Sequence, residues 1–247
     1  MKVVLLGTAG YHPSDQRQTS CLFLPALGVA FDAGTSFYRV RDRLITPTLD
    51  IYLTHAHLDH SVGLTFLLNV LHGRPAKRVT VYGAAEKLAS LREHLFHPDL
   101  FPVRIELEWR ALEAEQRLPD GARVQFWEQQ HPGGSLGYRV DGPGYSFALV
   151  TDTTADPQAP YVERIRGVDV LIHECNFADG QESLAARTGH SCAGPVAQVA
   201  QRAGVGRLVL THFDPLEQEV ELALDVDRLR TIFPRIELAS DNQEIDL

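Results

Sequence analysis

Four residues that can bind metal ions lie within six consecutive positions of this sequence. The segment THAHLDH supplies His55, His57, Asp59 and His60 directly after residues 50–54, which have the composition of a buried strand. A loop that follows a strand can aim alternate side chains into one cavity. Histidines at positions i and i+2 can then share one metal, while residues at i+4 and i+5 reach a second. Imidazole and carboxylate donors suit Zn²⁺, with Mn²⁺ or Fe²⁺ as alternatives. The competing interpretation is a histidine-rich surface loop that binds no metal.

Three further donors follow other apolar strands in the same way. They are His131 after residues 122–128, Asp152 after 145–150, and His212 after 207–210. Taken singly, each would more often be a cap or turn residue. Together with THAHLDH they complete two sites, because a carboxylate such as Asp152 can place one oxygen on each of two cations. The pattern therefore predicts two divalent metal ions per chain.

The elements that must position these donors are short strands, with helices between them. Strands are expected at residues 3–6, 21–24, 29–32, 50–54, 78–83, 103–109, 122–128, 136–140, 145–150, 168–172, 207–210 and 236–239, and helices at 84–95, 193–203 and 216–232. Strand-rich stretches followed by helices occur twice. This order predicts an α/β (α+β) fold, a four-layer αββα sandwich of two mixed β-sheets flanked by helices. Because no linker separates two parts, residues 1–247 are expected to form a single domain.

Composition narrows the function further. The chain has 247 residues and a formal charge of −9, which disfavours broad capture of nucleic acid by a basic surface. No apolar run approaches the roughly 20 residues that span a bilayer, so no membrane partner is expected. The N-terminal apolar run is too short for a signal peptide, and the three cysteines form no C-x-x-C pair. These features favour a cytoplasmic location.

The sequence resembles the metallo-β-lactamase superfamily and, within it, the phosphodiesterase branch typified by ribonuclease Z. The similar segments run along nearly the whole chain: LGTAGYHPSDQRQTS, LTHAHLDHSVGL, HPGGSLGYRV, TDT, VDVLIHECNF, GHS and LTHFDP. The resemblance implies the metallo-β-lactamase fold and a metal-dependent hydrolase. It also implies two groups of zinc ligands bridged by Asp152, namely His55, His57 and His131 on one ion and Asp59, His60 and His212 on the other.

The same resemblance implies residues that act beside the metals. His190 would lie next to the ions without binding them, although it could instead cap the helix that begins near residue 193. His173 and Glu174 would orient His190 or a metal ligand. Arg139 is a weaker candidate for phosphate binding, with a strand-surface charge as the alternative.

The expected chemistry is hydrolysis of a phosphodiester by a hydroxide that bridges the two ions. The ions lower the pKa of the shared water and neutralise the charge that develops on the phosphoryl oxygens. Asp59 could accept or orient the proton of that water. His190, when protonated, could stabilise the phosphoryl oxygens or protonate the leaving group.

Three departures from the ribonuclease Z pattern bear on the substrate. His131 and Asp152 are 21 positions apart, which leaves no room for the long arm that grips tRNA in that branch. The stretch after Asp32 lacks the usual Glu, and LTHF continues with Asp-Pro-Leu rather than Ser-Pro-Arg. A small cyclic or linear phosphodiester is therefore favoured over an RNA 3′ end. The alternatives are a ribonuclease Z-type tRNA 3′-end endonuclease, a thioesterase or lactonase of the same fold, and a non-catalytic metal-binding scaffold. Because related enzymes are often dimers, a homodimer is possible.

Overall fold

The computed structural model describes residues 1–217 and 219–247. By its internal contacts the chain divides into two compact units. The first unit comprises Met1–Glu115 and Asp241–Asp246, and the second comprises Gln116–Ser240 with Leu247. Each unit contains one seven-stranded sheet.

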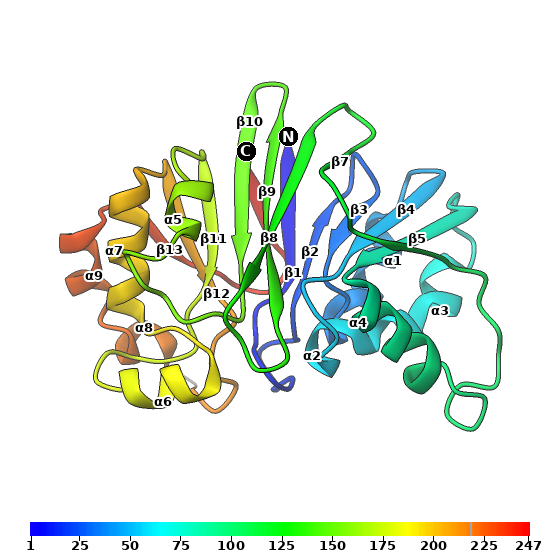
Figure 1. Cartoon of the computed structure of the whole chain (residues 1–247), viewed down its shortest axis with the longest axis horizontal. Helices are drawn as coiled ribbons and strands as arrows, with labels where there is room; N and C mark the ends of the chain where they lie inside the picture. Colours follow the sequence, from blue (N-terminus) through cyan, green and yellow to red (C-terminus); the bar gives the residue numbers. More distant parts are fainter. Residues whose placement is uncertain (218) are drawn as a thin grey trace. The chain divides into compact units, whose positions relative to one another are not determined.

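The sheet of the first unit has the strand order β14-β1-β2-β3-β4-β5-β6 (Figure 1). Its strands are β1 (Lys2–Gly7), β2 (Cys21–Leu24), β3 (Val29–Phe31), β4 (Thr48–Tyr52), β5 (Arg78–Gly83), β6 (Glu108–Ala111) and β14 (Gln243–Asp246). Pairing is antiparallel from β14 to β3 and parallel from β3 to β6. The parallel strands therefore end at one common edge.

Short helices pack on the sheet of the first unit. They are η1 (Thr35–Arg39), α1 (Val40–Arg43), α2 (Leu58–Ser61), η2 (Val62–Phe66), α3 (Leu67–Leu71), α4 (Ala85–Ser90) and η3 (Leu91–Leu95). Phe37 and Leu64 on these helices are buried in one apolar cluster with Ile51 and Val81 of the sheet. This burial removes apolar side chains from water and fixes the loops between strand and helix.

Three expectations for the first unit need correction. The helix expected at 84–95 changes into a π-helical turn, η3, over its second half. The strand expected at 103–109 is reduced to Glu108–Ala111, because residues 97–107 form neither helix nor strand. Strand β14 was not expected, and it pairs with β1 from the far end of the chain.

The sheet of the second unit has the order β13-β12-β11-β10-β9-β8-β7. Its strands are β7 (Gln116–Arg117), β8 (Arg123–Gln129), β9 (Ser135–Gly142), β10 (Tyr145–Val150), β11 (Val170–Glu174), β12 (Arg207–Thr211) and β13 (Ile236–Leu238). Pairing is antiparallel from β7 to β10 and parallel from β10 to β13. Strands β10 to β12 are buried almost throughout, as their unbroken apolar sequences predict.

The helices of the second unit are α5 (Tyr161–Arg164), α6 (Glu182–Thr188), α7 (Ala193–Ala203), α8 (Val220–Ala223) and α9 (Val226–Ile232). Figure 1 draws α7 and α9 beside strands β11 to β13. Helix α6 was not expected. The long helix expected at 216–232 is interrupted, since α8 and α9 are separate helices, and Gln218 in that range lies outside the described residues.

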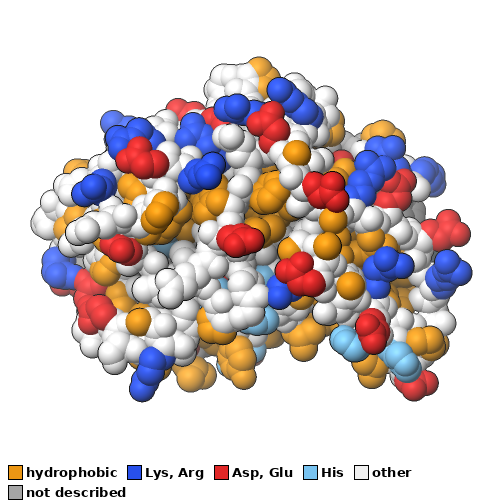
Figure 2. Space-filling view, in the orientation of Figure 1, with side chains coloured by type: hydrophobic (Ala, Val, Ile, Leu, Met, Phe, Trp, Pro, Cys, Tyr) orange, Lys and Arg blue, Asp and Glu red, His pale blue; other side chains and the backbone are white. Residues whose placement is uncertain are grey.

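The prediction of two mixed sheets flanked by helices is confirmed. The prediction that residues 1–247 form a single domain stays a prediction. Among the described residues, no helix has the length and apolar character needed to cross a membrane. On the face drawn in Figure 2, cationic and anionic side chains are interspersed. That face therefore presents no broad surface of one charge.

Candidate metal centre

The first unit brings the histidines of THAHLDH together at the ends of two neighbouring parallel strands. Strands β3 and β4 pair side by side, and the chain leaves β4 directly into the segment 53–60. The ring centroid of His55 lies 4.4 Å from that of His57 and 4.4 Å from that of His60. His57 is the N-cap residue of α2, which carries Asp59 and His60 in its four residues. The predicted proximity of these four residues is therefore present within this unit.

Asp32 anchors this group, although the sequence did not single it out as a site residue. Its Oδ2 lies 2.7 Å from Nδ1 of His60, and both side chains are fully buried. The backbone N–H and the hydroxyl of Thr54 also donate to Oδ1, at 2.7 and 2.9 Å. Burial raises the pKa of Asp32, while charge attraction and the hydrogen bond from His60 oppose that rise. A carboxylate here fixes the proton of His60 on Nδ1 and leaves Nε2 as the donor atom for a metal.

His55 is oriented in the same manner. The Thr54 hydroxyl, which donates to Asp32, lies 3.0 Å from Nδ1 of His55 and can accept its proton. Nε2 of His55 is then the nitrogen that carries the ring lone pair. His60 and His55 are thus oriented by the same hydrogen-bonded pair, in which the hydroxyl of Thr54 donates to Asp32.

Asp59 is held by the N-terminal loop. Its Oδ2 accepts a hydrogen bond from the backbone N–H of Tyr11 at 2.9 Å and lies 3.2 Å from Nε2 of His60. Gly34 allows helix α2 to approach, because a Cβ at that position would collide with the carbonyl oxygen of Asp59. The carboxylate and the imidazole can therefore bind one cation together.

The second unit presents its own donors at the ends of its strands. Asp152 follows β10 by two positions and His212 follows β12 directly, and Glu174 is the last residue of β11. His131 follows β8, which runs in the same direction as β10 because each is antiparallel to β9. All four side chains therefore stand at one edge of this sheet, as the strand-end pattern predicts.

The carboxylate of Asp152 faces one histidine with each oxygen. Nε2 of His131 lies 3.6 Å from Oδ1, and Nε2 of His212 lies 3.6 Å from Oδ2. These separations exceed a normal hydrogen bond. They match the spacing of two donors on one tetrahedral cation, since bonds of about 2.1 Å at the tetrahedral angle put the donor atoms about 3.4 Å apart. The donor set therefore fits a carboxylate that bridges two metal ions.

Neighbouring groups hold this arrangement in place. The hydroxyl of Thr151 donates to Oδ2 of Asp152 at 2.7 Å, and that of Ser135 donates to the Asp152 carbonyl at 2.8 Å. Nδ1 of His131 lies 3.0 Å from the carbonyl oxygen of Gly189, which fixes its proton there and leaves Nε2 for a metal. Ser135 and Gly189 are far in sequence from the residues they support, so no local motif could have indicated these two contacts.

His190 lies between the two histidines that face Asp152. Its ring centroid is 5.2 Å from that of His131 and 5.4 Å from that of His212. Donor atoms of His131, Asp152 and His190 lie within 4.8 Å of one another, as do those of Glu174, His190 and His212. His190 thus lies at the donor cluster of this unit, and its expected place beside the ions without binding them stays a prediction.

Glu174 fixes the orientation of His190. This buried carboxylate lies 3.1 Å from Nδ1 of His190 and accepts backbone hydrogen bonds from Thr153 and Ser191 at 2.8 and 3.1 Å. His173 has a different neighbourhood. Its Nδ1 lies 2.8 Å from the carbonyl oxygen of Glu174, and its Nε2 lies 3.2 Å from the hydroxyl of Tyr161. Of the two residues expected to orient His190 or a metal ligand, Glu174 contacts His190. The hydrogen bonds of His173 go to other groups.

Arg139 does not have the geometry expected for phosphate binding. Its guanidinium makes hydrogen bonds of 2.8 to 3.0 Å to the carboxylate of Asp141 and donates to the carbonyl oxygens of Arg164 and Arg166. Nε, Nη1 and Nη2 are all engaged by these contacts. The alternative interpretation, a strand-surface charge, is closer to the structure, in which Arg139 of β9 pairs with Asp141 and bonds two backbone carbonyls.

The chain is similar to known proteins along its length. A family model described as a beta-lactamase superfamily domain matches residues 29–213. A ribonuclease Z of Gemmatimonas aurantiaca is 30% identical, over 99% of this chain and 95% of that protein. The metallo-beta-lactamase fold protein YhfI of Bacillus subtilis has a TM-score of 0.79 at 20% identity, over 99% of each chain. The short form of human tRNase Z has a TM-score of 0.75 at 24% identity, over 100% of this chain and 99% of that one. The predicted metallo-β-lactamase fold is confirmed.

Proposed function

The chain belongs to the beta-lactamase superfamily and is a metal-dependent hydrolase related to ribonuclease Z, and we propose that it cleaves small phosphodiesters with two divalent metal ions. The observation that supports this most is the carboxylate of Asp152, with a histidine nitrogen 3.6 Å from each oxygen. A carboxylate shared in this way is the arrangement that a two-metal site requires.

The proposed ligand sets are those that the sequence resemblance implies. Nε2 of His131 lies near one oxygen of Asp152 and Nε2 of His212 lies near the other. A four-coordinate cation needs further donors. We assign His55 and His57 to the ion of His131, and Asp59 and His60 to the ion of His212. Nδ1 of His55, His60 and His131 is occupied by an oxygen of the protein, as is usual for histidines that bind a metal through Nε2.

Zinc is the proposed metal, because it favours imidazole and carboxylate donors in low coordination numbers, with Mn²⁺ or Fe²⁺ as alternatives. When bound, the ions would lower the pKa of an attacking water and neutralise the charge of the phosphoryl oxygens. Proton transfer to and from the reacting groups is proposed for side chains of the chain itself.

Two residues are proposed to move protons. Asp59 takes a proton from water as the water oxygen attacks phosphorus, and the bond between phosphorus and the leaving oxygen breaks. His190, protonated on both nitrogens with Nδ1–H directed at Glu174, donates its Nε2 proton to the leaving oxygen. The products are a phosphate monoester and an alcohol, so one water is consumed and both protons are accounted for.

A small substrate is favoured by the short connection between His131 and Asp152. That connection is the hairpin of β9 and β10, in which Gly142 pairs with Tyr145, and it carries no inserted arm. The second candidate is cleavage of an RNA 3′ end, which the name of the 30% identical ribonuclease Z favours. We further propose a cytoplasmic location, in keeping with three cysteines that are free and buried. A homodimer stays a prediction.

A substrate panel on metal-loaded protein tests the function. Bis(p-nitrophenyl) phosphate and cyclic nucleotides should be hydrolysed, and a thioester or a lactone should not. Preferential cleavage of precursor tRNA at its 3′ end would replace the small-substrate proposal with the second candidate. Turnover of the thioester alone, or of no substrate in protein shown to bind metal, would contradict the phosphodiesterase proposal.

A further inference from the structure

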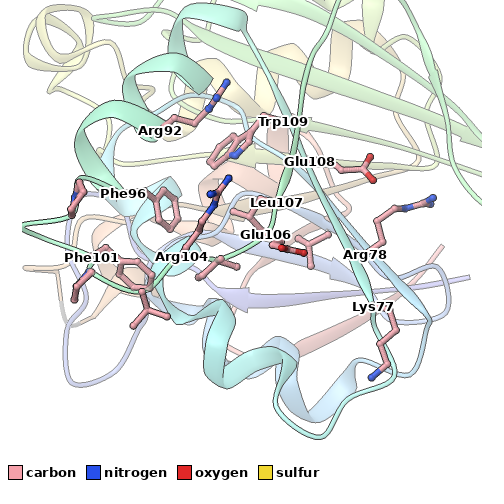
Figure 3. A pocket seen from close by; sticks show the side chains of 15 residues that line it. Lys77, Arg78, Arg92, Phe96, Phe101, Arg104, Glu106, Leu107, Glu108 and Trp109 are labelled. Atoms are coloured by element: carbon pink, nitrogen blue, oxygen red, sulfur yellow. The ribbon is translucent and has the colours of Figure 1, made fainter.

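The first unit contains a groove of about 670 Å³ that the proposed reaction does not use. It lies beside the starts of β5 and β6 and under the irregular segment 97–107 (Figure 3). Surface connections on a rigid scaffold often carry binding residues. The groove is therefore a candidate binding site.

Three aromatic side chains form one wall of the groove. The ring centroid of Phe96 lies 5.3 Å from that of Phe101 and 5.9 Å from that of Trp109, both in edge-to-face geometry. All three residues are partly exposed. Phe96 and Trp109 also pack against the apolar core of this unit, which makes them a rigid platform. A planar group can stack on such a platform at small entropic cost.

Four cations line the groove, and two of them, Arg92 and Arg104, lie beside the aromatic side chains (Figure 3). Lys77, Arg78, Arg92 and Arg104 line the groove and are exposed. In the part of the chain that the structure describes, none of the four forms an ion pair within 4.0 Å. Figure 3 shows the indole of Trp109 between the side chains of Arg92 and Arg104.

Two acidic residues also line the groove, and they leave an excess of positive charge. Glu108 is already paired with Arg110, at 2.6 Å, so Glu106 is the remaining carboxylate. This local excess contrasts with the net charge of −9 for the whole chain. The groove is thus suited to an anion that carries flat rings.

The groove is separate from His55, His57 and His60. Arg78 opens β5 and pairs with Thr48 at the start of β4. His55 lies seven positions further along, beyond the end of β4. At 3.3 Å per strand residue this is a distance of roughly 20 Å. A ligand in the groove would therefore not compete with metal ligands of the first unit.

We propose that this groove binds a short stretch of single-stranded nucleic acid. Phosphates would meet the guanidinium groups of Arg92 and Arg104, and a base would stack on Trp109 or Phe96. Stacking platforms framed by cations are how proteins hold single strands without reading their sequence. An acidic peptide would satisfy the cations but would leave the aromatic wall without a stacking partner. The inference goes beyond the proposed reaction, because it concerns binding at a second place.

The test is binding of a fluorescein-labelled oligoribonucleotide of about six nucleotides, a length within the usual site size. Fluorescence anisotropy is measured at low salt on the metal-loaded chain. Arg92→Ala combined with Arg104→Ala should weaken binding about tenfold or more. It should also reduce the salt slope of log K by about 0.7 for each phosphate that the variant no longer neutralises. A matched control is Arg187→Ala with Arg202→Ala, two exposed arginines of the second unit, which should bind like the wild type.

Stacking of a base on Trp109 can be measured separately, by the fluorescence of that indole. The chain has two tryptophans, so Trp127→Phe leaves Trp109 as the sole reporter. The oligonucleotide should quench its emission, and an equally charged glutamate peptide should neither quench it nor displace the probe. The same experiment with single-stranded DNA should give similar affinity, because the groove offers contacts to phosphates and bases only.

Several outcomes would overturn the inference. These are no binding at low salt, equal loss of binding in the control pair, stronger binding of the glutamate peptide, and binding of AMP as tight as that of the oligonucleotide. The variant Asp152→Asn separates this inference from the proposed reaction. It should lose hydrolysis and still bind the probe, whereas loss of both would place the bound strand at the metal centre instead.

Discussion

The carboxylate of Asp32 lies 2.7 Å from Nδ1 of His60 in a fully buried pair. This contact decides which nitrogen of His60 can bind a metal, and it is made by a residue at the end of the neighbouring parallel strand. The pairing of β3 with β4 therefore orients the ring of His60.

Replacement of Asp32 by Asn should weaken metal binding about 10- to 100-fold, because the partner that holds the proton on Nδ1 loses its charge. Asn keeps the size of the side chain and tolerates the left-handed backbone at this position, where φ is 63°. Metal content after dialysis, measured by elemental analysis, is the readout. Asp42→Asn, at an exposed residue, should retain wild-type metal content. Wild-type content in Asp32→Asn would show that the pair is not needed to orient His60.

His190→Ala should keep both metals and lose about 10²- to 10⁴-fold in kcat, the usual contribution of a general acid. The expectation follows from the proposed role of His190 as the proton donor, with Nδ1 directed at Glu174 and Nε2 at the leaving oxygen. Elemental analysis and turnover of bis(p-nitrophenyl) phosphate are measured on the same sample. A joint fall in metal and activity would show that His190 has a structural role.

Asp152→Asn is the matched opposite case. It should reduce metal content as well as activity, since a neutral amide cannot bridge two cations with two anionic oxygens. Asn is chosen because Asp152 has a φ of 53°, which most other residues adopt only with strain. Full metal content in this variant would contradict the bridging assignment.

Stability should fall in mild acid because of His173. Burial lowers the pKa of His173 below its ordinary value of 6.5, and both ring nitrogens are satisfied in the neutral form by Tyr161 and the Glu174 carbonyl. Below pH 6.5 the unfolded chain binds a proton there that the folded chain does not. Stability therefore decreases with a slope of up to about 1.4 kcal/mol per pH unit, until the pH reaches the lower folded pKa.

The comparison of unfolding midpoints between pH 7.5 and 5.5 isolates this effect. His173→Asn removes the titrating group while keeping a donor near the position of Nδ1, so its midpoint should change less on acidification than that of the wild type. His94→Asn, at an exposed histidine, should change as much as the wild type. An identical acid response of His173→Asn and wild type would show that other groups control it.

Arg139→Ala should lower stability by about 1–2 kcal/mol, because it removes charge-assisted bonds to Asp141 and to two backbone carbonyls. KM for a small phosphodiester should not change, since the guanidinium is already engaged. Urea unfolding and steady-state kinetics are the two measurements. A raised KM at unchanged stability would restore the phosphate-binding assignment.

The sequence was most informative where a chemical group and a strand end coincide. THAHLDH, Asp152 and His212 could be recognised because each metal donor directly follows an apolar run. Asp32 also follows such a run, but a single aspartate there is equally typical of a turn. Its role depends on the pairing of β3 with β4, which becomes visible only once the sheet order is known.

Predictions failed where tertiary packing decides the local structure. Residues 103–109 have strand-like composition, yet only Glu108–Ala111 pairs with β5, and Ile105 and Leu107 pack against the core instead. Strand β14 could not be predicted for a related reason. Its partner β1 lies at the opposite end of the chain, and no local pattern of residues 243–246 indicates that pairing.

Three residues at strand ends, Asp32, Asp152 and His212, have φ values of 63°, 53° and 59°. Aspartate, asparagine and histidine tolerate this backbone better than most residues, and glycine adopts it freely. Among substitutions of Asp32 and Asp152, those to asparagine and glycine should therefore be tolerated best by the backbone. They keep the turn but remove the negative charge. A descendant that lost the hydrolase activity while keeping the fold should carry asparagine or glycine at these positions.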